Sequence, residues 1–264
     1  MSDIERPLRR PEPAAAVRTV RVLTVNTHKG FTPLNRRFIL PELRKAVRAT
    51  DADVVFLQEV LGSHARHARR LLDWPKVPHY EFLADEIWPA FAYGRNAVYP
   101  DGHHGNALLS KYPIADHDNL DVSMSEGEKR GLLHCVLDLP GRAAALHVIC
   151  VHFGLTEGHR LAQTRLLCER LRDAVPADAP LVVAGDFNDW RLSAHGVLST
   201  TCRLREAFAE LQREVPKTFP ARWPLLRLDR VYLRNAEPRR ADVLSARPWS
   251  HLSDHTPLSV EVAL

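Results

Sequence analysis

The sequence is poor in the features that mark several classes of protein. Its 264 residues include four cysteines, Cys135, Cys150, Cys168 and Cys202, and no two of them form a CxxC pair. Such widely spaced cysteines are typical of free, mostly buried thiols in a reducing cytoplasm, and less so of disulfides or a zinc site. No apolar run nears the roughly 20 residues that span a bilayer, and the N-terminal stretch lacks the apolar core of a signal peptide. We therefore expect a cytoplasmic protein without a transmembrane segment.

What remains is the composition of an ordinary globular protein. Apolar residues make up 45% of the chain and charged residues 26%, which is enough to bury a sizeable core. The net charge of +4 permits an anionic partner but is equally compatible with a solvated basic surface, because a nucleic-acid footprint is a clustered patch. No low-complexity linker divides the chain. We expect a flexible N-terminal arm over 1–16 and a single, monomeric domain over 17–264.

Two segments of the chain repeat the same order of strand, helix and strand. The predicted elements cover 17–26, 35–50 and 52–60 in the first unit, and 144–154, 159–175 and 180–188 in the second. Nearly the same number of residues separates Asn26 from Glu59 as separates His152 from Asp186. A strand, crossover helix and parallel strand bring both strand ends to one edge of a sheet. Unless the spacing is coincidental, the two units predict two related α/β layers packed face to face.

The remaining elements are predicted less regularly. After Asn188 we expect one or two short helices around a turn at Gly196, and Pro41 is expected in the first turn of its helix. The other predicted strands cover 105–114, with a break at Tyr112-Pro113, 130–139, 225–233 and 253–262.

Polar residues gather at the expected ends of these strands. They comprise four carboxylates, two imidazoles and two amides: Asn26, Glu59, His152, Asp186, Asn188, Asp229, Asp254 and His255. Such oxygen-rich ligands suit Mg²⁺ or Mn²⁺ and not a tetrahedral zinc centre. Hydrolysis of a phosphate ester needs such a metal, a carboxylate that activates water, and donors for the non-bridging oxygens. The set therefore predicts a metal-dependent hydrolase of phosphate esters.

Seven short motifs also occur in the order found in a known superfamily. The segments LTVNTHKG, FLQEV, GNALLSKYPI, VHFG, GDFND, LDRVYL and LSDHTPL together resemble the endonuclease/exonuclease/phosphatase superfamily. Its members include deoxyribonuclease I, abasic-site endonucleases, neutral sphingomyelinases and inositol polyphosphate 5-phosphatases. The likeness covers 17–264 and is to an uncharacterised bacterial branch with segments similar to NRRFILPELR and FAYGRNAVYPDGHHGN. The resemblance implies a four-layered α/β sandwich, in which two packed mixed β-sheets are flanked by helices.

The resemblance assigns three residues to the metal, with Mg²⁺ or Mn²⁺ as the cofactor. Glu59 matches the principal metal ligand, and Asn26 matches an amide that supports the metal and the phosphate. Asp254 completes the metal or its water shell. Neighbouring residues of a strand point to opposite faces, so Asp254 and His255 can both serve only if they lie in a turn before the last strand.

Five residues are assigned to catalysis in the same way. Asp186 resembles the carboxylate that aligns and activates the attacking water, and Asn188 the amide that steadies the oxygens of the pentavalent phosphorus. His255 resembles the histidine that binds the scissile phosphate, and Asp229 the acid that orients its imidazole. His152 resembles the second histidine of the deoxyribonuclease and sphingomyelinase branches, a candidate to protonate the leaving oxygen.

Weaker candidates complete the expected site. Asn106 is a candidate for phosphate contact, and Glu128 for pairing with His152, although an exposed loop acid is the alternative. His28 and Lys29 either face the phosphate or lie in a loop.

Three functions follow from these assignments. We expect a phosphodiesterase of the nuclease type, with nucleic acid favoured by the mild positive charge. The alternative substrate is a lipid headgroup or a small phosphate ester, as in a sphingomyelinase. Its apolar rim would be formed by aromatic side chains, namely Trp88, Phe91, Tyr93, Trp223 and Trp249. A catalytically inert binding module is the third interpretation, and the complete set of carboxylates and histidines argues against it.

Overall fold

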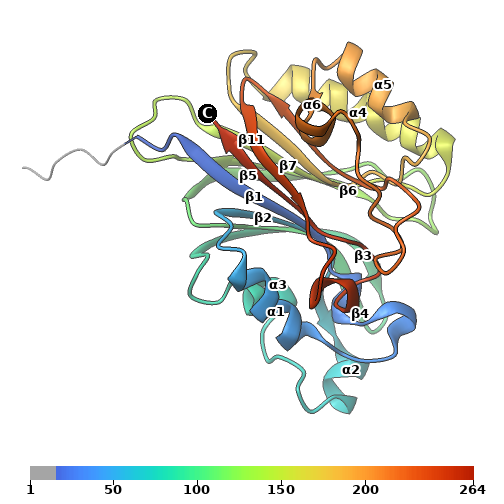
Figure 1. Ribbon diagram of the computed structural model, residues 1–264. Coiled ribbons are helices and arrows are strands. Elements are labelled where there is room, and N and C mark those ends of the chain that lie inside the picture. Colours follow the sequence, from blue (N-terminus) through green and yellow to red (C-terminus); the bar gives the residue numbers. More distant parts are fainter. Residues whose placement is uncertain (1–15) are drawn as a thin grey trace, which may run out of the picture.

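The computed structural model describes residues 16–264, so all but the last residue of the expected N-terminal arm lies outside the described residues. Two six-stranded mixed sheets face each other (Figure 1). The first has the order β11-β12-β1-β2-β4-β3, with β1 (Thr19–Asn26), β2 (Val54–His64), β3 (Ala90–Tyr99), β4 (Gly102–Ser110), β11 (Glu237–Val243) and β12 (Leu258–Ala263). The second has the order β5-β6-β7-β8-β10-β9, with β5 (Ile114–Asp121), β6 (Gly131–Leu137), β7 (Leu146–His152), β8 (Leu181–Asp186), β9 (Arg205–Glu206) and β10 (Asp229–Arg234).

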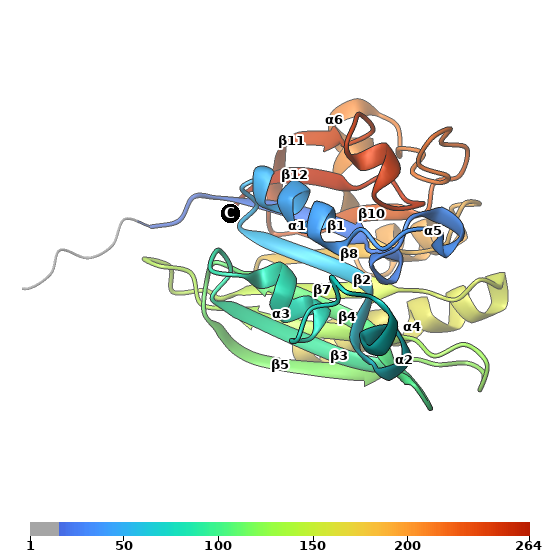
Figure 2. The same cartoon turned by 90° about the horizontal axis from the view of Figure 1, so that it is seen from below.

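Helices cover the outer faces of both sheets. Those of the first sheet are α1 (Leu40–Ala49), α2 (Ala65–Arg70) and α3 (His79–Ala84), seen in front of the strands in Figure 2. The second sheet carries α4 (Glu157–Ala174) and α5 (Ser193–Thr200), and α6 (Ala207–Gln212) packs against β9, β10 and β11. Three short 3₁₀ turns are η1 (His28–Gly30), η2 (Pro33–Asn35) and η3 (Trp249–His251). None of the helices within 16–264 is long and apolar enough to cross a membrane.

Three apolar clusters explain the layering. Val22 and Val148 belong to the cluster between the two sheets. Their chain neighbours point the other way: Leu23 packs under α1, and Ile149 packs under α4. Both faces of these strands are therefore buried, and each fully buried Val or Leu contributes about 1.5–3 kcal/mol of transfer free energy. The expected four-layered α/β sandwich is confirmed.

The two strand–helix–strand units are also confirmed. β1 and β2 are parallel, with Asn26 opposite Gln58, and β7 and β8 are parallel, with His152 opposite Asp186. Pro41 lies in the first turn of α1, as expected. Each unit therefore delivers polar residues to one edge of its sheet, and the packing of the sheets brings the two edges together.

Several elements differ from the predictions. Gly196 lies inside α5 and not in a turn. The edge strands β3, β5 and β11 were not predicted, because one face of each is exposed and their apolar alternation is weak. The predicted break at Tyr112-Pro113 is confirmed, and there the chain passes from β4 in the first sheet to β5 in the second.

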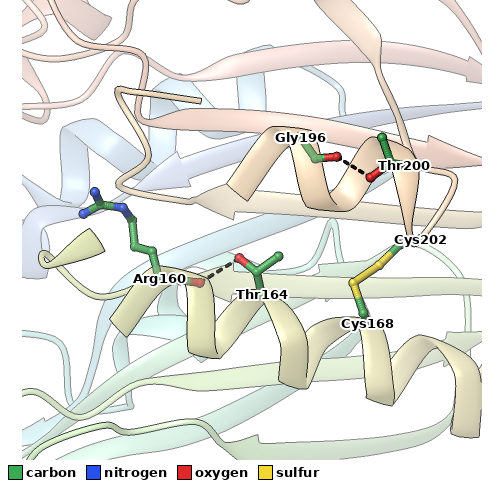
Figure 3. The surroundings of a disulfide bond; sticks show 6 residues. All are labelled: Arg160, Thr164, Cys168, Gly196, Thr200 and Cys202. Carbon is green, nitrogen blue, oxygen red and sulfur yellow. Dashed lines mark hydrogen bonds between the residues drawn. A yellow bond between two sulfur atoms is a disulfide. The ribbon is translucent and has the colours of Figure 1, made fainter. Parts of the chain in front are cut away.

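The cysteine prediction is wrong for one pair. Cys168 of α4 and Cys202, which follows α5, form a disulfide with their Cα atoms 5.7 Å apart (Figure 3). α4 and α5 pack side by side, and this brings together residues that are 34 positions apart in the chain. The spacing alone gave no sign of it. Cys135 and Cys150 are free and buried, as expected.

Candidate active site

Asp186, the last residue of β8, lies at the centre of the predicted site and is 1% exposed. Its Oδ2 atom is 3.2 Å from Asn26 Nδ2, 3.5 Å from His152 Nε2 and 3.7 Å from His255 Nε2. Its Oδ1 atom accepts a hydrogen bond of 2.9 Å from the backbone N–H of Asn188. Residues from β1, β7, β8 and the turn before β12 thus meet at one carboxylate, although they are spread over most of the chain.

The local geometry of β8 depends on Gly185. This residue has a φ of +143°, which L side chains rarely adopt, and a Cβ atom there would lie 2.0 Å from the carbonyl oxygen of Val151. The close approach keeps β7 and β8 in register, so that His152 and Asp186 end their strands together. The glycine of the GDFND motif is therefore required by packing against the neighbouring strand.

His255 forms a tight pair with Asp229. Its Nδ1 atom lies 2.8 Å from Asp229 Oδ2, and Asp229 is the β10 residue directly opposite Asp186. Both Asp254 and His255 lie in the turn before β12, as their joint use requires. Ser253 Oγ fixes this turn to the end of β1 by donating to the carbonyl oxygen of Asn26 at 2.7 Å.

The three buried ionisable groups at the centre differ in protonation. Burial disfavours the imidazolium of His255, but the charges of Asp229 and Asp186 outweigh it and raise the pKa of His255 to about 10. Burial raises the pKa of Asp186 to about 6. Burial, with the nearby charges of Arg130 and His255, lowers the pKa of His152 well below its ordinary value. At neutral pH the site therefore offers a cation, a carboxylate with a pKa near neutrality, and a neutral imidazole.

Glu59 and Asp254 flank one short turn of the chain. Lys29 Nζ lies 3.3 Å from Glu59 Oε2, and His28 Nδ1 lies 3.2 Å from Asp254 Oδ2. Glu59 occupies a bulge of β2 with a φ of +55°, and its carbonyl oxygen accepts a hydrogen bond of 3.0 Å from Thr27 Oγ1. Because His28 and Lys29 are consecutive, the two carboxylates lie on either side of the same turn. His28 and Lys29 thus lie in the turn η1 and contact the expected metal ligands.

These residues fit a hard divalent cation. Glu59 Oε2 is buried and accepts no hydrogen bond among residues 16–264, although Lys29 Nζ lies 3.3 Å away, so a metal ion bound there would compete with the lysine. Asn26 Oδ1 accepts from the N–H of His28 and keeps a second lone pair. All of these donor atoms are oxygen, as Mg²⁺ and Mn²⁺ prefer.

A second set of candidate ligand atoms is less suitable for a metal. Asp186, Asp229 and His255 each bring one ligand atom within 4.8 Å of the others. Despite burial, the charges of Asp229 and Asp186 favour the protonated form of His255 and so raise its pKa. The imidazolium between the two carboxylates partly neutralises their charge without a metal ion.

Asn188 and the unpredicted Asp189 shape the loop after β8. Asn188 has a φ of +50°, and its Nδ2 atom donates to the carbonyl oxygen of Phe153 at 2.9 Å, which leaves one amide N–H unused. Asp189 is wholly buried and caps α5, accepting from the N–H groups of Ser193 and Ala194 at 3.0 Å. Asp189 therefore positions the loop and does not face the site. Asp189 itself, the third polar residue of the GDFND motif, is the sequence signal that could have revealed this role.

Two weaker candidates lie elsewhere. Glu128 does not pair with His152, because its carboxylate is taken by Arg130 at 3.1 Å and His159 at 3.2 Å. The predicted pairing of Glu128 with His152 is therefore wrong. Glu128 meets His159 instead, because tertiary packing places the start of α4 beside it.

Asn106 is 0% exposed and donates to the carbonyl oxygens of Gly131 and Cys150, which joins the two sheets. Its contact with phosphate stays a prediction.

Comparison with known proteins agrees with the fold. The sequence profile of the Endonuclease/Exonuclease/phosphatase family matches residues 23–255. The chain is 54% identical over 244 residues to the "Uncharacterized protein YbhP" of Escherichia coli (strain K12), which covers 92% of this chain and 96% of that protein.

Solved structures share the fold at lower sequence identity. An endonuclease/exonuclease/phosphatase from Beutenbergia cavernae DSM 12333 is 21% identical, with a TM-score of 0.74 over 94% of this chain and 72% of that one. A D. rerio TDP2 humanized by 14 mutations is 18% identical, with a TM-score of 0.71 over 93% of this chain and 99% of that one. The chain therefore belongs to the endonuclease/exonuclease/phosphatase family.

Proposed function

We propose that the protein is a divalent-metal-dependent phosphodiesterase. The observation that carries this proposal is the meeting of Asn26, His152 and His255 on one carboxylate oxygen of Asp186. In the proposed reaction Asp186 accepts a proton from the attacking water, for which a pKa of about 6 is suited. The imidazolium of His255, oriented by Asp229, stabilises negative charge on the phosphoryl oxygens.

The remaining groups supply positioning. The unused N–H of the Asn188 amide can bind a phosphoryl oxygen. Neutral His152 contributes an N–H donor or a lone pair. The proton that Asp186 takes from the water can pass to His152, 3.5 Å away, which then gives it to the leaving oxygen as the bond from that oxygen to phosphorus breaks. Glu59 and Asp254, supported by Asn26, would hold Mg²⁺ or Mn²⁺, which neutralises charge on the phosphate when bound.

Of the five aromatic side chains considered for the rim of a lipid-directed enzyme, Phe91 at 41% and Trp223 at 75% are exposed. Trp88 and Trp249 are buried, with 0% and 8% exposure, and Tyr93 stacks on Tyr80. Trp223 alone among these tryptophans is largely exposed, at 75%. Nucleic acid therefore stays the favoured substrate, and a lipid headgroup or small phosphate ester the alternative. Because both sheets contribute to the site, we also propose that 17–264 acts as one domain.

A panel of phosphodiesters and phosphomonoesters, assayed with Mg²⁺, Mn²⁺ or chelator, tests this function. We expect turnover of diesters that chelator abolishes. Asp186→Asn and Glu59→Gln should each lower kcat by at least about a hundredfold, while Asp178→Asn, an exposed aspartate before β8, should not. Wild-type turnover by Glu59→Gln would refute the metal assignment, and no turnover of any ester would refute the function.

A further inference from the structure

A cleft of about 610 Å³ opens beside the catalytic groups. Residues 32–37 form part of one wall, residues 220–223 part of the other, and Ser253 and Asp254 line the end next to the proposed metal ligands. Its volume is within the range of small-molecule sites in proteins. None of the catalytic residues assigned above requires such a space, because the scissile phosphate is expected at Asp186 and His255. The cleft is therefore placed to receive a group next to that phosphate.

Both walls of the cleft expose a large apolar side chain. Trp223 is 75% exposed and Leu34 is 76% exposed, and Leu225 close by in the chain is 66% exposed. An indole left in water beside an active site is a typical contact for a planar ligand. The aromatic surface is limited to one ring, so it matches one planar group better than an extended apolar chain.

The same walls carry positive charge. Arg36 and Arg37 lie on one side and Arg222 on the other. Arg37 pairs with Glu42, whereas Arg36 and Arg222 form no ion pair with any residue between 16 and 264. His251 also lines the cleft, and partial desolvation and the charges of Arg222 and Arg247 lower its pKa. Because Arg36 and Arg222 have no ion-pair partner among the described residues, they are available to a phosphate, which guanidinium groups bind well.

The two walls are held in place by backbone contacts. The N–H of Ala221 donates to the carbonyl oxygen of Asp254 at 2.8 Å, and that of Trp223 donates to Pro220 at 3.1 Å. On the other wall Leu34 and Asn35 adopt positive φ angles of +63° and +53°, which are costly for residues other than glycine. A site whose walls are ordered before the ligand arrives loses less entropy on binding.

We propose that this cleft binds the nucleotide next to the scissile phosphate of a single-stranded nucleic acid, with its base stacked on Trp223 and its phosphate at Arg36 and Arg222. The inference rests on the proposed phosphodiesterase function and adds the substrate class. Stacking requires an unpaired base, which a single strand offers and a duplex does not. Aromatic stacking with flanking cations is tolerant of sequence, so little base preference is expected.

Binding of a fluorescein-labelled single-stranded oligonucleotide, measured by anisotropy in the presence of chelator, tests the stacking contact. Trp223→Ala should weaken binding by about tenfold or more. Trp223→Tyr should keep most of the affinity, whereas Trp223→Leu should lose it, because leucine is apolar but does not stack. Leu72→Ala, a truncation of another fully exposed side chain, is the matched control.

The salt dependence of the same binding tests the phosphate contacts. Each phosphate contact to a single strand contributes about 0.7 to the slope of log K against log salt concentration. Arg36→Ala and Arg222→Ala should each reduce the slope by about that amount. Arg203→Ala removes another exposed arginine, next to Cys202, and should leave the slope unchanged. An unchanged slope in the first two variants would overturn the inference.

Hydrolysis of bis(4-nitrophenyl) phosphate with Mn²⁺ separates this inference from the function on which it rests. We expect the wild type to hydrolyse this small diester, and Trp223→Ala to weaken oligonucleotide binding measured in chelator, where no hydrolysis occurs. If the wild type hydrolyses the diester but Trp223→Ala binds the oligonucleotide normally, the cleft inference is overturned and the function stands. If no ester is hydrolysed but oligonucleotide binding depends on Trp223, the phosphodiesterase function fails, and only the binding part of the inference, a single strand stacked on Trp223, stands. Binding to anionic lipid vesicles in place of the oligonucleotide, with Trp223→Leu fully active, would also overturn it.

Discussion

Lys29 Nζ lies 3.3 Å from Glu59 Oε2, the atom that the site offers to a metal ion. His28 makes a similar contact with Asp254 from the neighbouring position of the same turn. Both His28 and Lys29 have positive φ angles, of +44° and +57°, so the turn is held in a conformation that residues other than glycine seldom adopt. The protein therefore places the Lys29 ammonium beside Glu59 and the His28 imidazole beside Asp254, the two carboxylates expected to bind metal.

Replacing Lys29 should consequently strengthen metal binding. Lys29→Met removes a positive charge that competes for Glu59 while keeping the aliphatic stem. Lys29 is partly exposed, so solvent screening limits its pairing energy to about 1 kcal/mol, or roughly a fivefold gain in affinity for Mn²⁺. Isothermal titration calorimetry on the unliganded protein measures the effect. Lys45→Met, on the exposed side of α1, should change nothing, and equal affinities of the wild type and Lys29→Met would show that Lys29 does not compete.

The part of the site that could be predicted from the sequence is the part that regular structure determines. Asn26, His152 and Asp186 end strands whose length and polarity are visible in the sequence, and parallel pairing places such ends together. Asp229 meets Asp186 because β10 pairs with β8 in antiparallel register. The two βαβ units and the layering of the sheets follow from the same periodicity.

The remainder depends on contacts that no local pattern encodes. The pairing of Lys29 with Glu59 requires a left-handed turn and a strand bulge to face each other. Glu128 meets His159 and not His152 because α4 begins where tertiary packing places it. Edge strand β11 is exposed on one face and contains Pro238 next to a register shift, which weakens its sequence signal.

Reduction of the Cys168–Cys202 bond should destabilise the protein. The bond closes a long loop between α4 and the segment after α5, and loss of a crosslink over 34 residues costs about 4 kcal/mol in the chain-entropy description. We expect dithiothreitol to lower the Tm of the wild type by roughly 8 °C and that of Cys168→Ser not at all.

Thiol titration of the unfolded, unreduced protein checks that the bond forms. Cys135 and Cys150 alone should react, giving two thiols per chain. The count matters because disulfides seldom persist in a reducing cytoplasm, the location expected from the sequence. Four reactive thiols in protein purified without reductant would contradict the bond.

His79 should make the fold sensitive to acid. Its ring is buried against Phe38 and Trp74, and neither ring nitrogen has a hydrogen-bond partner among the described residues. Burial lowers the pKa of His79 to about 3. The unfolded chain therefore binds a proton below pH 6.5 that the folded chain does not, and stability falls as the pH decreases from 6.5 towards 3.

The size of this effect is about 2 kcal/mol between pH 7 and pH 5. Urea denaturation of His79→Leu at the two pH values should show a correspondingly smaller loss than in the wild type. His117→Leu, which removes an exposed imidazole of β5, should lose as much stability as the wild type does. Parallel pH profiles for wild type and His79→Leu would show that His79 does not contribute.

Glu206 should have the opposite pH dependence. Burial raises the pKa of Glu206 to about 7, although its Oε2 atom accepts the N–H of Ala209 at 2.7 Å and so caps α6. Between pH 4.5 and 7 the folded state holds a proton that the unfolded state releases, so stability falls as the pH rises through this range and is constant above it. A shift of this size corresponds to at most about 3 kcal/mol.

Glu206→Gln removes the charge and keeps an oxygen that can cap α6, so it isolates the ionisation from the hydrogen bond. The variant should be more stable than the wild type at pH 8, and the difference should vanish near pH 4.5. Glu210→Gln changes an exposed glutamate of the same helix that pairs with Arg205, and it should show no such gain. Because His79 destabilises the fold at low pH and Glu206 at higher pH, the double variant should have a flatter stability profile than either single variant. A Glu206→Gln protein that is less stable than the wild type at pH 8 would mean that the ionised carboxylate is favoured as a cap, contrary to the direction of its pKa shift.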